Sequence, residues 1–371
     1  MKDNIKKTFA IVFMLAIGAA FGAGIATIVI DALGEERGAG EYFFMLALYV
    51  LLLYAVYFIH IIVHESGHLV FGLLTGYKFN SFRIGSVIMT KENGKIRFSR
   101  FSLMGTAGQC LLSPPEEKEG KIPFKLYNLG GVIFNLLLAA LSLALYFVLP
   151  KAPTLSVLLL GSVVIGLFCA FTNGVPMNGV VNNDGSNAVA LGKDIHAMRS
   201  FAKQLSVNAR MAQGERLCNM PTELFELGDG ADTRNPINNT ITVFKCNRLL
   251  DEHRFAEARE LCEKLIADET VMPIYKNMLI CDLAFCEMLA GETERAKSRF
   301  TKAQNKFIAA MAKNPSIIRT RYAYALLCEK NAIDAGKYRT DFEKAAESYP
   351  YSGDIESERE LMAEAKKAVE K

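Results

Sequence analysis

Four long apolar stretches constrain the fold of this chain more than any other feature. Each is long enough for a helix that crosses a hydrocarbon core, which takes about 20 residues. The first is longer than the apolar part of a signal peptide and ends in no clear cleavage site, so we expect it to be retained. The four stretches cover residues 8–32, 43–75, 127–149 and 155–177.

The placement of Lys and Arg predicts the orientation of these crossings, because basic flanks stay on the cytoplasmic side. Three lysines precede the first crossing, and segment 76–125 carries nine basic residues. The two connections predicted to lie outside hold one each, Arg37 and Lys151. We therefore expect an integral, multi-pass protein whose N-terminus, 76–125 segment and C-terminal domain are cytosolic. Short outer connections suit a bacterial plasma membrane.

Charge and cysteine content exclude several classes of protein. A formal net charge of +3 over 371 residues indicates no nucleic-acid partner. The eight cysteines are scattered, with no CxxC pair and no regular spacing, so neither a disulfide framework nor a zinc ribbon is expected. We interpret them as reduced thiols, mostly in a cytosolic domain.

The second crossing contains a candidate metal site with the pattern H-E-x-x-H. His64 and His68 are four residues apart and share one helical face, so both imidazoles can reach one ion. Zinc suits neutral imidazole nitrogens and keeps a position open for water, whose proton Glu65 would accept. The pattern also occurs by chance, but two His and a Glu in an apolar span are costly without a functional environment.

A complete site needs a third ligand at a similar depth in the membrane, and Asp184 is the candidate. It follows the fourth crossing at the end predicted to be cytosolic, where His68 also lies. The alternative is that Asp184 belongs to an ordinary turn, because Asn, Asp and Gly favour turns wherever they cluster.

In these and two further motifs the chain resembles the site-2 protease family of intramembrane zinc metalloproteases. The resemblance covers about residues 43–195 and rests on three motifs in the family's order. Asn183 stands where the family usually has Leu, and the interval before Asp184 is longer than in many members. The motifs are HESGH at 64–68, Gly130-Gly131-Val132-Ile133-Phe134-Asn135, and Asn173-Gly174-Val175-Pro176 followed by Asp184-Gly185.

The resemblance implies roles for individual residues. His64, His68 and Asp184 would be the ligands of Zn²⁺, and Glu65 the catalytic base. Asn135 would be a catalytic polar contact to the substrate or its oxyanion; the alternative is that it only packs and hydrogen-bonds between membrane helices. His60 lies one turn before His64, and we expect it to support or line the site, because the family takes two histidines from this helix.

The cytosolic segment between the second and third crossings predicts a small β-hairpin. Apolar and polar residues alternate over 82–90 and 95–101, on either side of Glu92-Asn93-Gly94-Lys95. Asn-Gly between such runs is the strongest short hairpin signal. In the resembling family an element here lies against the membrane and can offer a strand edge to substrate, and a plain surface hairpin is the alternative.

The fold class expected is an α-helical membrane protein, with about four transmembrane helices and the hairpin, followed by a soluble all-α tetratricopeptide-like helical array. The array is suggested by loosely repeated helix spacing and by small residues at Ala258 and Ala296. We expect a metalloprotease domain over 1–200 with its core at 43–195, an amphipathic helix and linker over 201–240, and the array over 241–371. Its helices are expected at 241–252, 255–267, 274–290, 293–312, 316–331, 334–348 and 354–370.

The motifs and the expected array suggest two functions from different classes. The first is a zinc-dependent intramembrane endopeptidase that cleaves membrane-anchored proteins near the cytosolic face, with the array binding a protein partner. The alternative is a non-catalytic membrane adaptor that uses only the array. The intact Glu65 favours the enzyme, because packing has no use for a buried carboxylate.

Overall fold

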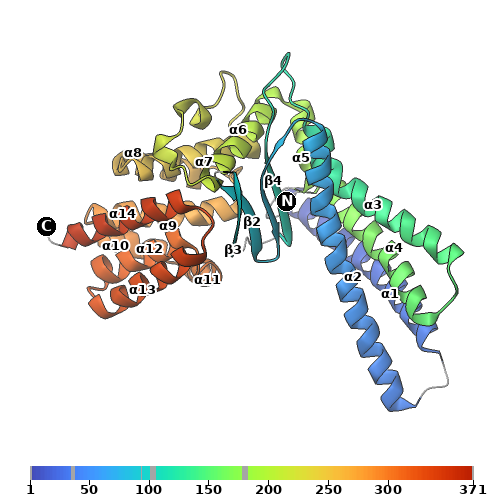
Figure 1. Cartoon of the computed structure of the whole chain (residues 1–371). Helices are drawn as coiled ribbons and strands as arrows, with labels where there is room; N and C mark the ends of the chain where they lie inside the picture. The colour runs from blue at the N-terminus through green and yellow to red at the C-terminus, as the bar shows by residue number, and fades with distance from the viewer. Residues whose placement is uncertain (1, 35–37, 93, 101–105, 178–182, 370–371) are drawn as a thin grey trace. The chain divides into compact units, whose positions relative to one another are not determined.

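The computed structural model describes residues 2–34, 38–92, 94–100, 106–177 and 183–369. The chain folds into two compact units (Figure 1). Segment 76–124 groups with the C-terminal helices, although we expected it in one domain with the membrane helices. The sequence alone does not reveal this grouping, because the grouping depends on contacts between segments far apart in the chain. The first unit comprises Met1–Thr75, Lys125–Asn178 and Asn182–Val189, and the second Gly76–Phe124, Gly179–Val181 and Ala190–Lys371.

The first unit is a bundle of long helices. Among the described residues, four helices are long and apolar enough to cross a membrane, which confirms the four expected stretches. Helix α4 packs against both α1 and α2. The four helices are α1 (Lys2–Leu33), α2 (Ala39–Leu74), α3 (Phe124–Val148) and α4 (Pro153–Gly174).

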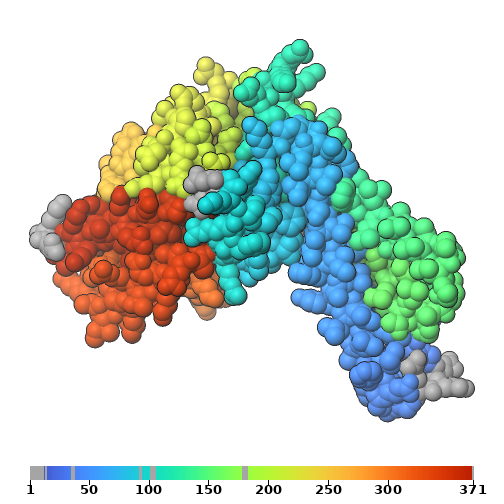
Figure 2. Space-filling view, viewed as in Figure 1, coloured from blue at the N-terminus to red at the C-terminus, as the bar shows by residue number. Residues whose placement is uncertain are grey.

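Much of the surface of these helices is apolar and uncovered, as expected of side chains that face lipid. Along α2 the exposed side chains include Phe43, Phe44, Leu51 and Tyr54, and Figure 2 shows much of this helix free of other segments. His60, His64, Glu65 and His68 of α2, in contrast, are buried, and the three histidines contact α3 or α4. A bilayer cannot hydrate such groups, so the bundle must provide their partners.

The second unit begins with a four-stranded antiparallel sheet of order β3-β2-β1-β4. The expected hairpin is confirmed, since β2 pairs with β3 and Glu92 with Lys95, although Asn93 of its predicted turn lies outside the described residues. The single strand expected over 82–90 is wrong: the chain turns at Gly85, whose φ is +57°, and Ile84 pairs with Val87. Helix α6 packs against the sheet. The strands are β1 (Lys78–Ile84), β2 (Val87–Glu92), β3 (Lys95–Arg100) and β4 (Gly108–Ser113).

Helices form the rest of the second unit. The amphipathic helix expected within 201–240 is α6, which begins earlier, at Ile195, and most later helices fall within a few residues of their expected bounds. The helix expected over 293–312 is broken, because Thr301 caps a new helix through the backbone N–H of Gln304. The helices are α6 (Ile195–Ala212), α7 (Pro236–Asp251), α8 (Phe255–Ala267), α9 (Pro273–Leu289), α10 (Thr293–Arg299), α11 (Lys302–Ala310), α12 (Pro315–Ala323), the π-helical turn η3 (Tyr324–Cys328), α13 (Ala332–Ser348) and α14 (Ser352–Val369).

The segment expected to be a linker is folded. Two short 3₁₀ helices, η1 (Leu217–Asn219) and η2 (Thr222–Phe225), precede α7, and Leu217, Met220 and Phe225 are buried together against α6. The abundant Pro, Gly and Asp residues therefore shape tight turns here and do not keep the segment extended. All eight cysteines are free thiols in the structure.

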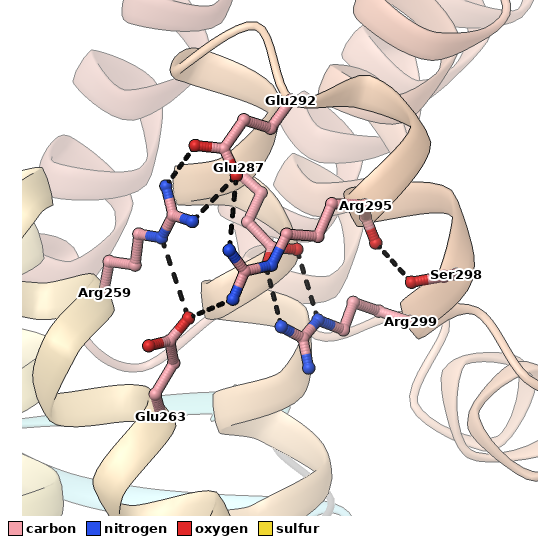
Figure 3. Close-up of polar contacts among 7 residues, drawn as sticks. All are labelled: Arg259, Glu263, Glu287, Glu292, Arg295, Ser298 and Arg299. Carbon is pink, nitrogen blue, oxygen red and sulfur yellow. Dashed lines mark hydrogen bonds and ion pairs between the residues drawn. The ribbon is translucent and has the colours of Figure 1, made fainter.

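A continuous apolar core joins α7, α8, α9, α12, α13 and α14. Beside it, charged side chains tie α8, α9 and α10 together (Figure 3). Glu287 of α9 is fully buried and accepts from Arg299, 2.7 Å from Nη2, and pairs with Arg295 at 2.9 Å. Glu292 binds both terminal nitrogens of Arg259 at 2.6 and 2.7 Å.

Candidate metal centre

Helix α2 brings His64 and His68 together on one face. Their Nε2 atoms are 3.2 Å apart, and both side chains are buried within the first unit. Glu65, between them in sequence, is also buried, at 7% exposed. These three polar residues lie in a helix of high hydropathy, as expected from the sequence.

Helix α3 reaches these histidines because glycines line the crossing. A Cβ added at Gly67 would lie 2.2 Å from the carbonyl oxygen of Gly130, so the two backbones touch. A Cβ at Gly131 would lie 2.5 Å from Cε1 of His64. Close approach also lets Nδ1–H of His68 donate to the backbone oxygen of Tyr127 at 2.7 Å. That hydrogen bond orients the ring and leaves its Nε2 free.

Asp184 is the first residue of α5 (Asp184–Lys193), and the side chain of Asn183 fixes its position. Nδ2 of Asn183 donates to the carbonyl oxygens of Thr172 and Val175 at 2.8 and 2.6 Å, which ties it to the end of α4. Its Oδ1 accepts from the backbone N–H of Ser186 at 2.9 Å, as an N-cap does. Asn183, which departs from the family's usual Leu, therefore holds Asp184 against the bundle.

Three donor atoms from two distant segments meet at one point. Oδ2 of Asp184 lies 3.1 Å from Nε2 of His64 and 3.4 Å from Nε2 of His68. This oxygen is buried and accepts no well-aligned hydrogen bond from the part of the chain that the structure describes. Burial acts to raise the pKa of Asp184, but the imidazoles of His68 and His64 outweigh burial and hold this pKa well below its usual range.

This triangle fits zinc. Tetrahedral coordination at about 2.0–2.1 Å from the ion places neighbouring ligand atoms roughly 3.3 Å apart. The three observed separations, from 3.1 to 3.4 Å, bracket that value. Two imidazole nitrogens and one carboxylate leave a fourth position for water or substrate, as catalytic zinc sites require. Among the described residues, these three form the group suited to hold a metal.

Asn135 of α3 lies beside the triangle and is fully buried. Its Nδ2 is 3.0 Å from Nδ1 of His64, and its Oδ1 is 3.1 Å from Nδ1 of His60. The sequence brought Asn135 and His60 to attention but did not predict that they meet. It also missed Asn183 as a cap, although Asn directly before a helix is a readable N-cap signal. The backbone oxygen of Tyr127 leaves no signal in sequence.

One of three comparisons with known proteins identifies a family for this chain. The sequence model of peptidase family M50 matches residues 51–324, which is more than half of the chain and includes both segments that supply the three donor atoms. A comparison with curated proteins found no match, and neither did a comparison with solved structures. On this match, the chain belongs to peptidase family M50, the site-2 protease family of membrane metallopeptidases.

Proposed function

We propose that this protein is a zinc-dependent intramembrane endopeptidase that cleaves membrane-anchored protein substrates near the cytosolic face. The observation that carries the proposal is the convergence of His64, His68 and Asp184 on one point, with separations suited to zinc. Membership of family M50 supports a metallopeptidase. The apolar helices around the site support substrates that are themselves in the membrane.

In this proposal His64, His68 and Asp184 hold the ion, and Glu65 moves the proton. A zinc ion there would supply Lewis acidity, which favours ionisation of water and polarises a peptide carbonyl. Glu65 accepts the proton of the attacking water and delivers it to the leaving amine. The partial burial of the site limits bulk water, which strengthens electrostatic interactions among these groups.

The location of cleavage follows from the position of the site along α2. His68 lies six residues before the end of α2 at Leu74, and the basic segment 76–124 follows directly. Because basic flanks stay inside, we place this end, the N-terminus and the second unit on the cytosolic side of a bacterial plasma membrane. Substrates would then be cut close to the cytosolic surface.

We further propose that α7–α14 form a tetratricopeptide-like array that binds a protein partner. The successive helices α7 and α8, α9 and α10, and α12 and α13 pack against each other, and the small residues Ala258 and Ala296 are fully buried between them. Such stacks expose extended surfaces for protein segments. If the array recruits substrate, Glu65→Gln protein should co-purify with an uncut substrate, and deletion of 236–369 should abolish that co-purification.

Asn135 has less support as a contact to the substrate oxyanion. Its side chain is 0% exposed, and both ends of its amide lie within hydrogen-bond distance of imidazoles. The adaptor alternative is also weakened, since a protein that has lost catalysis has no use for a base and three convergent donor atoms. Substrate cleavage separates the two functions directly.

The test compares the membrane proteomes of cells that carry the wild-type protein or its Glu65→Gln variant. Substrates should accumulate uncut in the variant, while zinc content stays near one ion per chain. Asp184→Asn should lose both zinc affinity and cleavage. Asp194→Asn is the matched control, because Asp194 caps α6 and Asn is an equally good cap. Identical proteomes for the wild type and Glu65→Gln would refute the peptidase.

A further inference from the structure

A chain of buried polar side chains leads from His64 away from the three donor atoms. Asn135 of α3 bridges His64 to His60 of α2. Nε2 of His60 lies 3.0 Å from Oγ of Ser162 on α4, and Oγ of Ser142 lies 2.9 Å from the same oxygen. All five residues are buried, and they come from three different helices. Polar groups in an apolar bundle are costly unless they serve packing or function.

The bundle makes room for the His60 ring. A Cβ added at Gly166 of α4 would lie 2.7 Å from Cε1 of His60 and 3.0 Å from Cβ of Ala139. The ring therefore fills a space that any other residue at 166 would close. With its two nitrogens facing Asn135 and Ser162, this ring has little freedom to turn.

The direction of the hydrogen bonds in this chain decides whether His64 can bind a metal. A neutral imidazole that ligates through Nε2 carries its hydrogen on Nδ1, and that N–H needs an acceptor. Asn135 offers an acceptor only through Oδ1. In the structure the Nδ2 end faces His64, which leaves the hydrogen of neutral His64 on Nε2. A 180° turn of the amide exchanges the two ends and puts Oδ1 in place.

The partner at the other end of the amide selects between these two orientations. When the hydrogen of His60 is on Nε2, it donates to Oγ of Ser162, and Nδ1 of His60 becomes an acceptor. Nδ2 of Asn135 then turns to donate to His60, and Oδ1 turns to accept from His64. The tautomer of His60 is thus coupled, through one amide, to the tautomer of His64.

We propose that His60 is a positioning residue which, through Asn135, selects the tautomer of His64 whose Nε2 is free for the metal. The inference rests on the proposed zinc site and gives Asn135 the role of orienting a ligand. His60 and Asn135 then act on zinc affinity before any substrate binds. Partners of ligating histidines typically change metal affinity by about 10- to 100-fold when they are removed.

The first experiment measures zinc affinity in purified, detergent-solubilised protein by competition with a chromogenic chelator. His60→Phe keeps a ring but removes both nitrogens, and should weaken zinc binding by about 10- to 100-fold. Ser162→Ala should weaken it in the same direction and less, and it carries the test if His60→Phe does not fold. Tyr49→Phe is the control on α2, because the buried hydroxyl of Tyr49 has no hydrogen-bond partner among the described residues. Wild-type affinity in both His60→Phe and Ser162→Ala would overturn the proposal.

The second experiment separates orientation from packing. Asn135→Asp offers an acceptor at both ends, so His64 no longer depends on how the side chain is turned. In the Asn135→Asp background, His60→Phe should therefore weaken zinc binding by less than about 3-fold, where about 10-fold or more is expected in the wild-type background. The absorption of bound Co²⁺, which reports ligand geometry, should be restored in parallel.

Equal losses in the two backgrounds would show that His60 acts only by packing and would overturn the inference. The proposed function fails differently. In that case the wild-type protein would bind no stoichiometric zinc, or His64→Ala would bind zinc as tightly as the wild type.

Discussion

A methyl group added at Gly131 should show whether the contact between α3 and the His64 imidazole is needed for metal binding. A Cβ at 131 would lie 2.5 Å from Cε1 of His64 and 2.6 Å from its Nδ1 and Nε2, whereas ordinary contacts begin at 3.4 Å. In Gly131→Ala the imidazole or the α3 backbone must therefore move by roughly 0.9 Å. Metal–ligand distances tolerate only about 0.2 Å. We expect zinc affinity to fall on the order of 100-fold, with peptidase activity lost in parallel.

The assay is zinc competition on purified protein, with bound metal measured by mass spectrometry and folding checked by circular dichroism. Gly22→Ala is a matched control, since it makes the same change in α1, where a Cβ would meet nothing within 4 Å. Gly22→Ala should behave as the wild type. Unchanged zinc affinity in Gly131→Ala would mean that α3 does not lie against His64, and would refute the close contact between Gly131 and the His64 imidazole.

Three further predictions concern the second unit and the topology. Burial raises the pKa of Asp354 and that of Glu358 to about 7. Between about pH 4 and pH 7 these two carboxyl groups are therefore protonated in the folded chain and ionised in the unfolded chain, so the folded state gains stability as the pH falls. Hydrogen-exchange protection of α14 should therefore rise as pH falls from about 8 to 5, and a flat profile would contradict this. Glu287→Gln should destabilise the helices by about 1–3 kcal/mol in thermal unfolding, because the Glu287 side chain is fully buried. Glu292→Gln should destabilise them less, because the Glu292 side chain is 40% exposed, and equal effects would refute the ranking. Reporters at residue 100 and at the C-terminus should both read as cytosolic, and an external signal at 100 would overturn the crossing count.

The amino-acid sequence by itself determined the membrane helices and the histidine pair. Four apolar stretches longer than about 20 residues have few alternatives to spanning helices, because a bilayer leaves backbone groups no partner except their own helix. The spacing of His64 and His68 places them on one helical face whatever surrounds them. The Asn-Gly hairpin was predictable for the same reason, since its turn geometry is local.

Tertiary structure alone decided which distant groups complete the site. The position of Asp184 depends on where the start of α5 meets α2. That of Asn135 depends on where α3 crosses α2, a crossing that needs glycines whose backbones can touch, such as Gly67 against Gly130. Likewise, the grouping of segment 76–124 with the C-terminal helices and the folded state of the expected linker arise from contacts far apart in sequence. Local patterns carry no record of such contacts, because their free energy comes from surfaces that meet only in the folded chain.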